Sequence, residues 1–117
     1  MFKIKIKRVY EAPEPEDGYR MLVDKLWPRG LKKEVAALDE WNKDITPSTE
    51  LRKWFGHKPE NFERFGNLYQ LELSAKTDEL KRILALAEQQ NLTLLYAAKS
   101  KEINHARILL DVLMQLI

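Results

Sequence analysis

Three segments of the chain have the hydrophobic pattern of β-strands, and they differ in how far each is expected to be buried. Residues 2–10, FKIKIKRVY, alternate apolar and charged positions, which predicts a strand with one exposed face. Residues 19–27, YRMLVDKLW, form a more apolar strand. Residues 92–98, LTLLYAA, are almost wholly apolar, which is typical of a strand covered on both faces. The pattern therefore predicts a sheet of about three strands.

Between the second and third strands, and again after the third, apolar residues recur at intervals of three and four, the period of an α-helix. A first helix is expected over 31–42. A second is expected to be capped by Thr46 or Ser48 and to end at Gly56. Three more helices are predicted by the apolar stripes Phe62, Phe65, Tyr69 and Leu73; Leu80, Ile83, Leu84 and Ala87; and Ile103, Ala106, Leu110, Leu113 and Ile117.

These elements predict a single α/β domain in which a small, mainly parallel sheet packs against helices. Residues 28–91 are long enough for a crossover connection, so the second and third strands are expected to be parallel. The loop at 11–18, EAPEPEDG, suits an antiparallel neighbour better than a crossover, which needs about a dozen residues. A mixed sheet is therefore the alternative.

The composition is that of a soluble globular protein, with 44% hydrophobic and 32% charged residues among 117. The absence of cysteine excludes disulfides, a thiolate nucleophile and a cysteine-based zinc site. The amino terminus lacks the unbroken apolar region of a secretory signal, and no apolar run approaches the length of a bilayer span. We therefore expect a cytoplasmic protein with no membrane partner.

Charge gives limited evidence for nucleic-acid binding. The net charge is only +2, and the basic residues of the first strand are followed at once by acids, so the two groups nearly cancel beyond a Debye length of about 10 Å. An edge strand protected by solvated lysines is the favoured interpretation, and a phosphate-binding strip is the alternative. The charges involved are Lys3, Lys5, Lys7 and Arg8, then Glu11, Glu14, Glu16 and Asp17.

A second segment invites the same alternative. RKWFGHKPENFERF, at 52–65, interleaves aromatic and basic residues as single-strand nucleic-acid surfaces do. Its aromatic residues also fit helix core stripes, which is the favoured interpretation. A nucleic-acid- or protein-binding module is thus the alternative function. The exposure of Trp54 and Phe55 distinguishes the two, because only exposed rings can serve a partner surface.

The residues best suited to ligand chemistry follow the second and third strands. Ligands of open parallel sheets bind beyond the carboxyl ends of the strands, where the WPRG loop at 27–30 would face Lys99 and Ser100. The last helix is expected to begin near Ile103 to His105 and to direct free N–H groups at the same edge. Together with Arg29 and Lys99, this edge suits a phosphate or carboxylate group.

Two titratable residues at this edge are candidates for proton chemistry. His105 lies in the first turn of a predicted helix, where a neutral imidazole is favoured, so it could transfer a proton. The alternative is a packed, hydrogen-bonded histidine. Asp24 sits in an apolar strand and needs a partner, for which Arg29, Lys43 or His105 is available. An ion pair that orients the loop is favoured over a general base.

Neither a metal nor a nucleotide cofactor is expected. His57 and His105 are the only histidines, and neither stands in an i, i+4 pair with another ligand. The chain has no glycine-rich phosphate loop.

Three stretches of the sequence resemble the YeaO-like family of bacterial proteins. They are DGYRMLVDKLWPRGLKKE (17–34), ALDEWNKDITPSTELRKWFGHKP (37–59) and LLYAAKSKEINHA (94–106), and the resemblance runs from about Arg8 to the last residue. It implies a compact cytoplasmic bacterial α/β protein and no established reaction. The chain departs from the family pattern at Lys25, Lys58 and Phe62. The family motifs map onto Arg8, Arg20, Asp24, Trp27, Pro28, Arg29, Trp41, Lys43, Trp54, His57, Lys99, Asn104 and His105.

The residues and the resemblance together predict a small-molecule site at the carboxyl ends of the strands. Its ligand is expected to be anionic. Arg29, Lys43 and Lys99 are expected to hold the anionic group, with Asn104 capping it and Trp27 forming an apolar wall. His105 is expected to transfer a proton, and Asp24 is expected to orient a cation.

Overall fold

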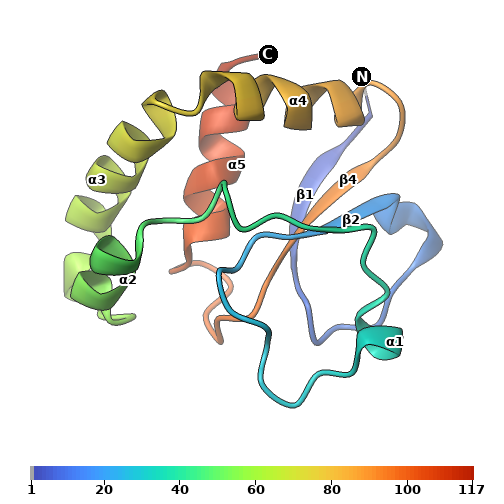
Figure 1. Ribbon diagram of the computed structural model, residues 1–117, viewed down its shortest axis with the longest axis horizontal. Helices are drawn as coiled ribbons and strands as arrows, with labels where there is room; N and C mark the ends of the chain where they lie inside the picture. The colour runs from blue at the N-terminus through green and yellow to red at the C-terminus, as the bar shows by residue number, and fades with distance from the viewer. Residues whose placement is uncertain (1) are drawn as a thin grey trace.

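The computed structural model describes residues 2–117 as a four-stranded parallel sheet with helices on both faces (Figure 1). The strands are β1 (Ile4–Arg8), β2 (Tyr19–Leu22), β3 (Glu40–Trp41) and β4 (Leu92–Tyr96), in the order β1-β4-β2-β3. The predicted α/β class and the parallel arrangement of the second and third predicted strands are confirmed. The sheet has one strand more than expected because the two-residue β3 adds an edge beside β2.

The antiparallel preference for the first strand is wrong. β1 pairs in parallel with β4, with Ile4 opposite Leu92 and Arg8 opposite Tyr96. The connection at 9–18 only has to return along a strand of five residues, a distance of about 17 Å. Ten extended residues reach about 33 Å, so no helix is needed, and the connection contains only the short 3-10 helix η1 (Pro15–Asp17).

Most helices pack on one face of the sheet. They are α2 (Thr49–Phe55), α3 (Phe62–Ser74), α4 (Thr77–Ala87) and α5 (His105–Gln115), and a short 3-10 helix, η2 (Pro59–Asn61), precedes α3. Of the two caps expected for α2, the structure uses Ser48, whose hydroxyl accepts a hydrogen bond from the Leu51 amide at 3.2 Å. The helix ends at Gly56 in the left-handed conformation, as predicted.

The helix expected over 31–42 is much shorter. Only α1 (Lys33–Ala36) forms, and Ala37 ends it in a left-handed conformation at φ 49°. Val35, an apolar residue within this segment, is 56% exposed. Trp41 instead pairs with Leu22 in the sheet, so backbone pairing decides the conformation of a segment whose apolar spacing also fits a helix.

The two faces of β4 belong to different apolar clusters, which is why the whole strand is buried. Leu92, Leu94 and Tyr96 join the large cluster under the helices. Leu95 joins a smaller one with Val9 and Leu22, covered by Trp27, Leu31, Leu38 and Trp41. The second cluster fixes the segment after β2, and that segment carries three of the seven residues predicted for the site, Asp24, Trp27 and Arg29.

A cluster of charged side chains fills the rest of the second face. The carboxylate of Asp17 is fully buried and accepts hydrogen bonds from the ammonium groups of Lys5 and Lys7, each at 3.0 Å, and from the Arg20 guanidinium. β1 is an edge strand as predicted, but Lys7 is only 8% exposed, so the interpretation of solvated lysines is wrong for this residue. The reason is that η1 folds back over the sheet and places its acid against the strand.

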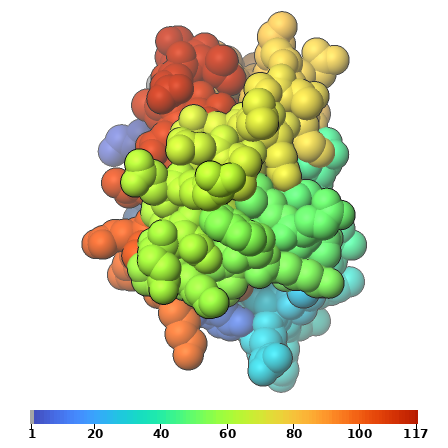
Figure 2. Space-filling model, turned by 90° about the vertical axis from the view of Figure 1, so that its left-hand side faces the viewer, coloured from blue at the N-terminus to red at the C-terminus, as the bar shows by residue number. Residues whose placement is uncertain are grey.

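The segments after β2 and β4 reach the same edge of the molecule. In the space-filling view onto α2 and α3, these two helices cover the middle of the face, and the two segments project below them in cyan and orange (Figure 2). Among residues 2–117, no helix has the length and apolar character to cross a membrane.

Candidate functional site

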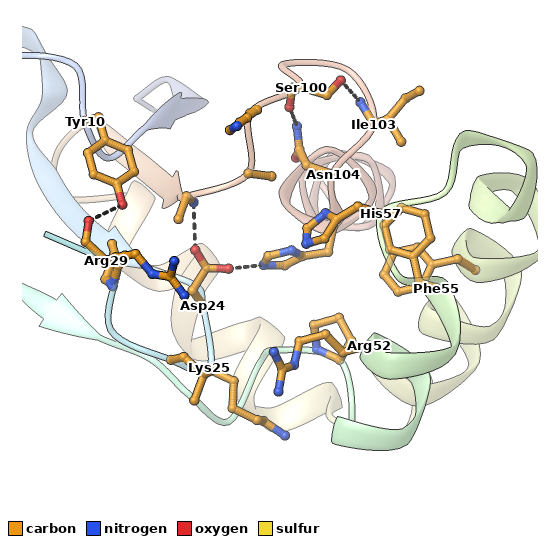
Figure 3. Close-up of a pocket in the computed structure, with 18 of the residues that line it drawn as sticks. Tyr10, Asp24, Lys25, Arg29, Arg52, Phe55, His57, Ser100, Ile103 and Asn104 are labelled. Carbon is orange, nitrogen blue, oxygen red and sulfur yellow. Dashed lines mark hydrogen bonds and ion pairs between the residues drawn. The ribbon is translucent and has the colours of Figure 1, made fainter. Parts of the chain in front are cut away.

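A cavity of about 690 Å³ opens at the carboxyl ends of β2 and β4. Its walls come from the segments after β1, β2 and β4, from α2 and the residues that follow it, and from the start of α5 (Figure 3). The structure therefore brings together the WPRG loop, the residues after β4 and the beginning of the last helix.

Six of the seven residues predicted for the site line this cavity, and Lys43 does not. The Lys43 ammonium lies 4.1 Å from the centre of the Trp41 ring, in a cation–π contact. The six lining residues are Asp24, Trp27, Arg29, Lys99, Asn104 and His105.

Asp24 ties three elements together at the cavity floor. Its Oδ2 accepts a hydrogen bond from the Ala97 amide at 2.7 Å, and its Oδ1 lies 3.4 Å from His105 Nε2 (Figure 3). Of the partners considered for Asp24, the structure thus supplies His105. The same Nε2 donates to the Val23 carbonyl oxygen, which can only accept, so Nε2 carries the proton. His105 Nδ1 makes no hydrogen bond within residues 2–117 and is the ring atom free to meet a ligand.

The start of α5 is capped from within the chain. Asn104 Oδ1 accepts from the Arg107 amide at 2.9 Å, and its Nδ2 donates to the Ser100 carbonyl at 3.0 Å. Ser100 Oγ in turn accepts from the Ile103 amide at 2.9 Å. The predicted helix start is confirmed. The Asn104 side chain is thus engaged within the chain, where it holds the helix start to the residues that precede it.

Four cationic side chains surround the cavity without a partner. Within residues 2–117, Lys25, Arg29, Arg52 and Lys99 form no ion pair and no side-chain hydrogen bond, although all four line the cavity. Asp24 is the lining carboxylate, and it is already engaged. Arg52 Nε is in addition buried from solvent with no hydrogen-bond acceptor. The lining of the cavity therefore carries an unbalanced positive charge.

Arg52 was missed at the sequence level because the aromatic residues of its segment dominated the interpretation. The guanidinium reaches the cavity from α2, whereas Arg29 reaches it from the loop after β2 (Figure 3). The signal that points to Arg52 is its i, i+3 spacing from Phe55, which puts both residues on one side of the helix.

The α2 side of the cavity is aromatic. Phe55 stacks on Phe65 with ring centres 4.2 Å apart, and the His57 ring lies 5.7 Å from Phe55. His57 is a non-glycine residue in the left-handed region, at φ 58°, directly after the left-handed Gly56. This backbone turn places the imidazole on the cavity wall (Figure 3). Among residues 2–117, no three histidine or acidic side chains are grouped closely enough to hold a metal ion.

Comparison with known proteins identifies relatives of this chain along nearly its whole length. A 108-residue alignment with "Uncharacterized protein YeaO" of Escherichia coli strain K12 is 53% identical and covers 92% of this chain and 94% of the relative. "Uncharacterized protein Rv3073c" of Mycobacterium tuberculosis strain H37Rv is 39% identical over 113 residues, which cover 95% of this chain and 93% of the relative. No solved structure matches the chain.

A family model described as "Inactive DUF488-N3 subclade" matches residues 3–117. The resemblance drawn from the W-P-R-G, W-F-G-H and N-H-A motifs is thereby confirmed, since the relative from E. coli carries the YeaO name. The chain belongs to the YeaO-like bacterial family, within the inactive DUF488-N3 subclade.

Proposed function

We propose that this protein binds a small molecule bearing a carboxylate or phosphate group in the cavity at the carboxyl ends of β2 and β4. The observation that carries the proposal is the set of four unpaired cations, Lys25, Arg29, Arg52 and Lys99, around a cavity whose carboxylate is engaged elsewhere. The four cations and the Asp24 carboxylate, with both histidines neutral, give the lining a formal charge of +3.

Among the four cations, Arg52 is the one whose guanidinium is partly buried. A buried donor without an acceptor costs about 1–3 kcal/mol of stability, and the Nε of Arg52 is such a donor. A ligand in the cavity does not touch this buried Nε, but its oxygens can accept from the terminal nitrogens of the same guanidinium, in the two-point geometry that arginine favours.

Binding without turnover fits the other polar residues of the site. Asp24 and His105 hold each other and the ends of β2 and β4, and the description of the subclade as inactive agrees with a binding role. The proton-transfer role of His105 stays a prediction. If His105 performs it, the transfer goes through Nδ1, with Asp24 stabilising the imidazolium across the ring.

A thermal-unfolding titration tests the binding proposal. Sodium phosphate and sodium sulfate are compared with sodium chloride at equal ionic strength, using the unmodified protein, Arg52→Gln and Lys53→Gln. Lys53 neighbours Arg52 on α2 but does not line the cavity, so it is the matched control for the loss of one positive charge. An anion at ten times its dissociation constant adds about 1.4 kcal/mol to the free energy of unfolding, roughly 4–6 °C in midpoint temperature.

We expect phosphate or sulfate to stabilise the unmodified protein and Lys53→Gln, and to stabilise Arg52→Gln much less. Equal shifts in all three proteins would refute the proposal, because the stabilisation would then be a general effect of salt. The absence of any shift beyond that of chloride would refute it as well.

The alternative of a nucleic-acid-binding module rests on one exposed ring. Trp54 is 44% exposed, whereas Phe55 is 4% exposed and belongs to the core. The basic first strand does not support this alternative, since Lys5 and Lys7 pair with Asp17 and Arg8 Nε donates to the Ala98 carbonyl. Binding of single-stranded DNA or RNA whose affinity falls steeply with salt would favour it. No binding at low salt would remove it.

A further inference from the structure

The cavity is too large for a small inorganic anion alone. Its volume of about 690 Å³ compares with about 30 Å³ for one water molecule in the liquid. A phosphate ion has five heavy atoms and would leave most of this space to water. Cavities of about 300–1,000 Å³ are the usual size for organic ligands, which fill them with apolar atoms as well as polar ones.

The wall next to Arg52 is aromatic and consists of the core ring of Phe55, which is 4% exposed, and the exposed ring of His57. Phe55 is held rigidly, because it stacks on Phe65 at 4.2 Å and Phe65 packs on Tyr69 at 5.9 Å in turn. The His57 ring extends this wall from its position 5.7 Å from Phe55. Aromatic faces and edges attract other aromatic rings in offset-stacked or edge-to-face arrangements.

The backbone at His57 supports a role for this ring. A left-handed conformation costs a non-glycine residue about 1–2 kcal/mol, and glycine or asparagine would adopt it more readily. His57 holds it at φ 58° on the cavity wall. Strained backbone retained beside a cavity is a recognised property of ligand sites.

The spacing along α2 relates the ring wall to the charge. Arg52 and Phe55 are one helical turn apart, so their Cβ atoms are separated by about 5–6 Å. Because both side chains also line the cavity, a molecule with an aromatic ring and an attached acidic group can extend from this wall to the Arg52 guanidinium.

We infer that the ligand joins a planar aromatic ring to its acidic group, with the ring against the exposed His57 beside Phe55 and the acidic group on Arg52. The inference rests on the proposed anion site and adds the class of molecule that the site selects. The apolar part of the ligand occupies space that an inorganic anion would leave to water.

Three phosphates and two variants test this class. Calorimetric or NMR titrations compare phenyl phosphate with glycerol phosphate, which carries the same acidic group on an aliphatic chain, and with inorganic phosphate. Phenol, which has the ring without the acidic group, is the uncharged control. His57→Asn removes the imidazole and keeps a residue suited to a positive φ, so the fold is preserved. Arg52→Gln removes the charge that the phosphate group requires.

We expect phenyl phosphate to bind at least about ten-fold more tightly than glycerol phosphate, a difference of about 1.4 kcal/mol. His57→Asn should weaken phenyl phosphate and leave glycerol phosphate unchanged, whereas Arg52→Gln should weaken both. Equal affinities for phenyl and glycerol phosphate, both lost in Arg52→Gln, would overturn the aromatic class and leave the anion site standing. Phenol binding as tightly as phenyl phosphate, or no binding by any phosphate, would overturn the anion site itself.

Discussion

Replacing Asp17 with asparagine tests whether the charged cluster on the second face holds the sheet together. The Asp17 carboxylate is fully buried and faces three cations, from Lys5, Lys7 and Arg20. The substitution Asp17→Asn would keep the size of the side chain but remove its charge. Lys7 and Arg20, with exposed side-chain fractions of 8% and 5%, would then share a nearly dry site without their central anion.

The expected loss of stability follows from the burial of these groups. Removing one partner of a buried ion pair costs about 3–5 kcal/mol, because the remaining charge is left without compensation. Glu14 still faces Lys7 in the variant. Because Glu14 is exposed, solvent screens this ion pair, and the pair restores little of the lost stability. A domain of this size has about 5–15 kcal/mol of stability in total, so a large fraction would be lost. The midpoint temperature should fall by roughly 12–20 °C.

The pH dependence provides a second readout with a definite sign. Burial opposes ionisation of Asp17, but hydrogen bonds from Lys5, Lys7 and the Glu14 amide outweigh it and hold the pKa of this carboxyl well below its usual range. A lowered folded-state pKa means that the group stabilises the protein above its unfolded pKa, near 3.8, and that this contribution is lost as the pH falls below that value. The variant should lack this component of acid unfolding.

Urea unfolding at neutral pH and at stepwise lower pH measures both effects. Glu16→Gln is the matched control, because Glu16 is the exposed acid directly before Asp17 and forms no ion pair within residues 2–117. The control should change the free energy of unfolding by less than about 0.5 kcal/mol. A loss below about 1 kcal/mol in Asp17→Asn, or an acid profile identical to that of the unmodified protein, would contradict the reasoning.

Two further predictions concern backbone geometry. Gly18→Ala should destabilise the protein by more than about 2 kcal/mol in urea unfolding, because Gly18 has φ 63° and an added Cβ would clash with the Asn91 carbonyl oxygen; unchanged stability would show that this contact between the β1–β2 connection and the residue before β4 is not tight. Ser48→Ala should cost about 1–2 kcal/mol, since the hydroxyl caps α2 and donates to Glu72 at 2.7 Å. Ser48→Asp serves as the comparison: it restores the cap but faces the Glu72 carboxylate, so equal stability of the aspartate variant and the unmodified protein would argue against a role for that hydrogen bond.

The local elements could be predicted because their signals are short-range. The apolar run at 92–98 became β4, which is fully buried but ends two residues earlier than predicted, at Tyr96. The glycine after Phe55 ended α2, and Asn104 capped α5 beside the residues where a helix start was expected. Each of these outcomes depends on a few neighbouring residues, so the sequence alone carries the information.

The candidate site could be predicted in part, for a topological reason. Once β2 and β4 are parallel, the loops that follow them must emerge at one edge, which places Arg29, Lys99 and His105 around one cavity. Lys43, which was also predicted for the site, does not line the cavity. Its ammonium is held over Trp41, which lies in β3.

The sequence by itself determined where most apolar faces lie, where α2 ends, and that the second and third predicted strands are parallel in an α/β sheet with a polar edge. Only the tertiary structure decided the direction of β1, the burial of Lys7 on Asp17, and the arrival of Arg52 at the cavity. In each case the deciding contact joins two elements, and the hydrophobic pattern of neither element specifies the other. β1 pairs with β4, whose residues lie about ninety positions after those of β1, and η1 folds back over the sheet. Local patterns fix which side of an element is apolar, but the identity of the partner depends on how the whole chain closes its core.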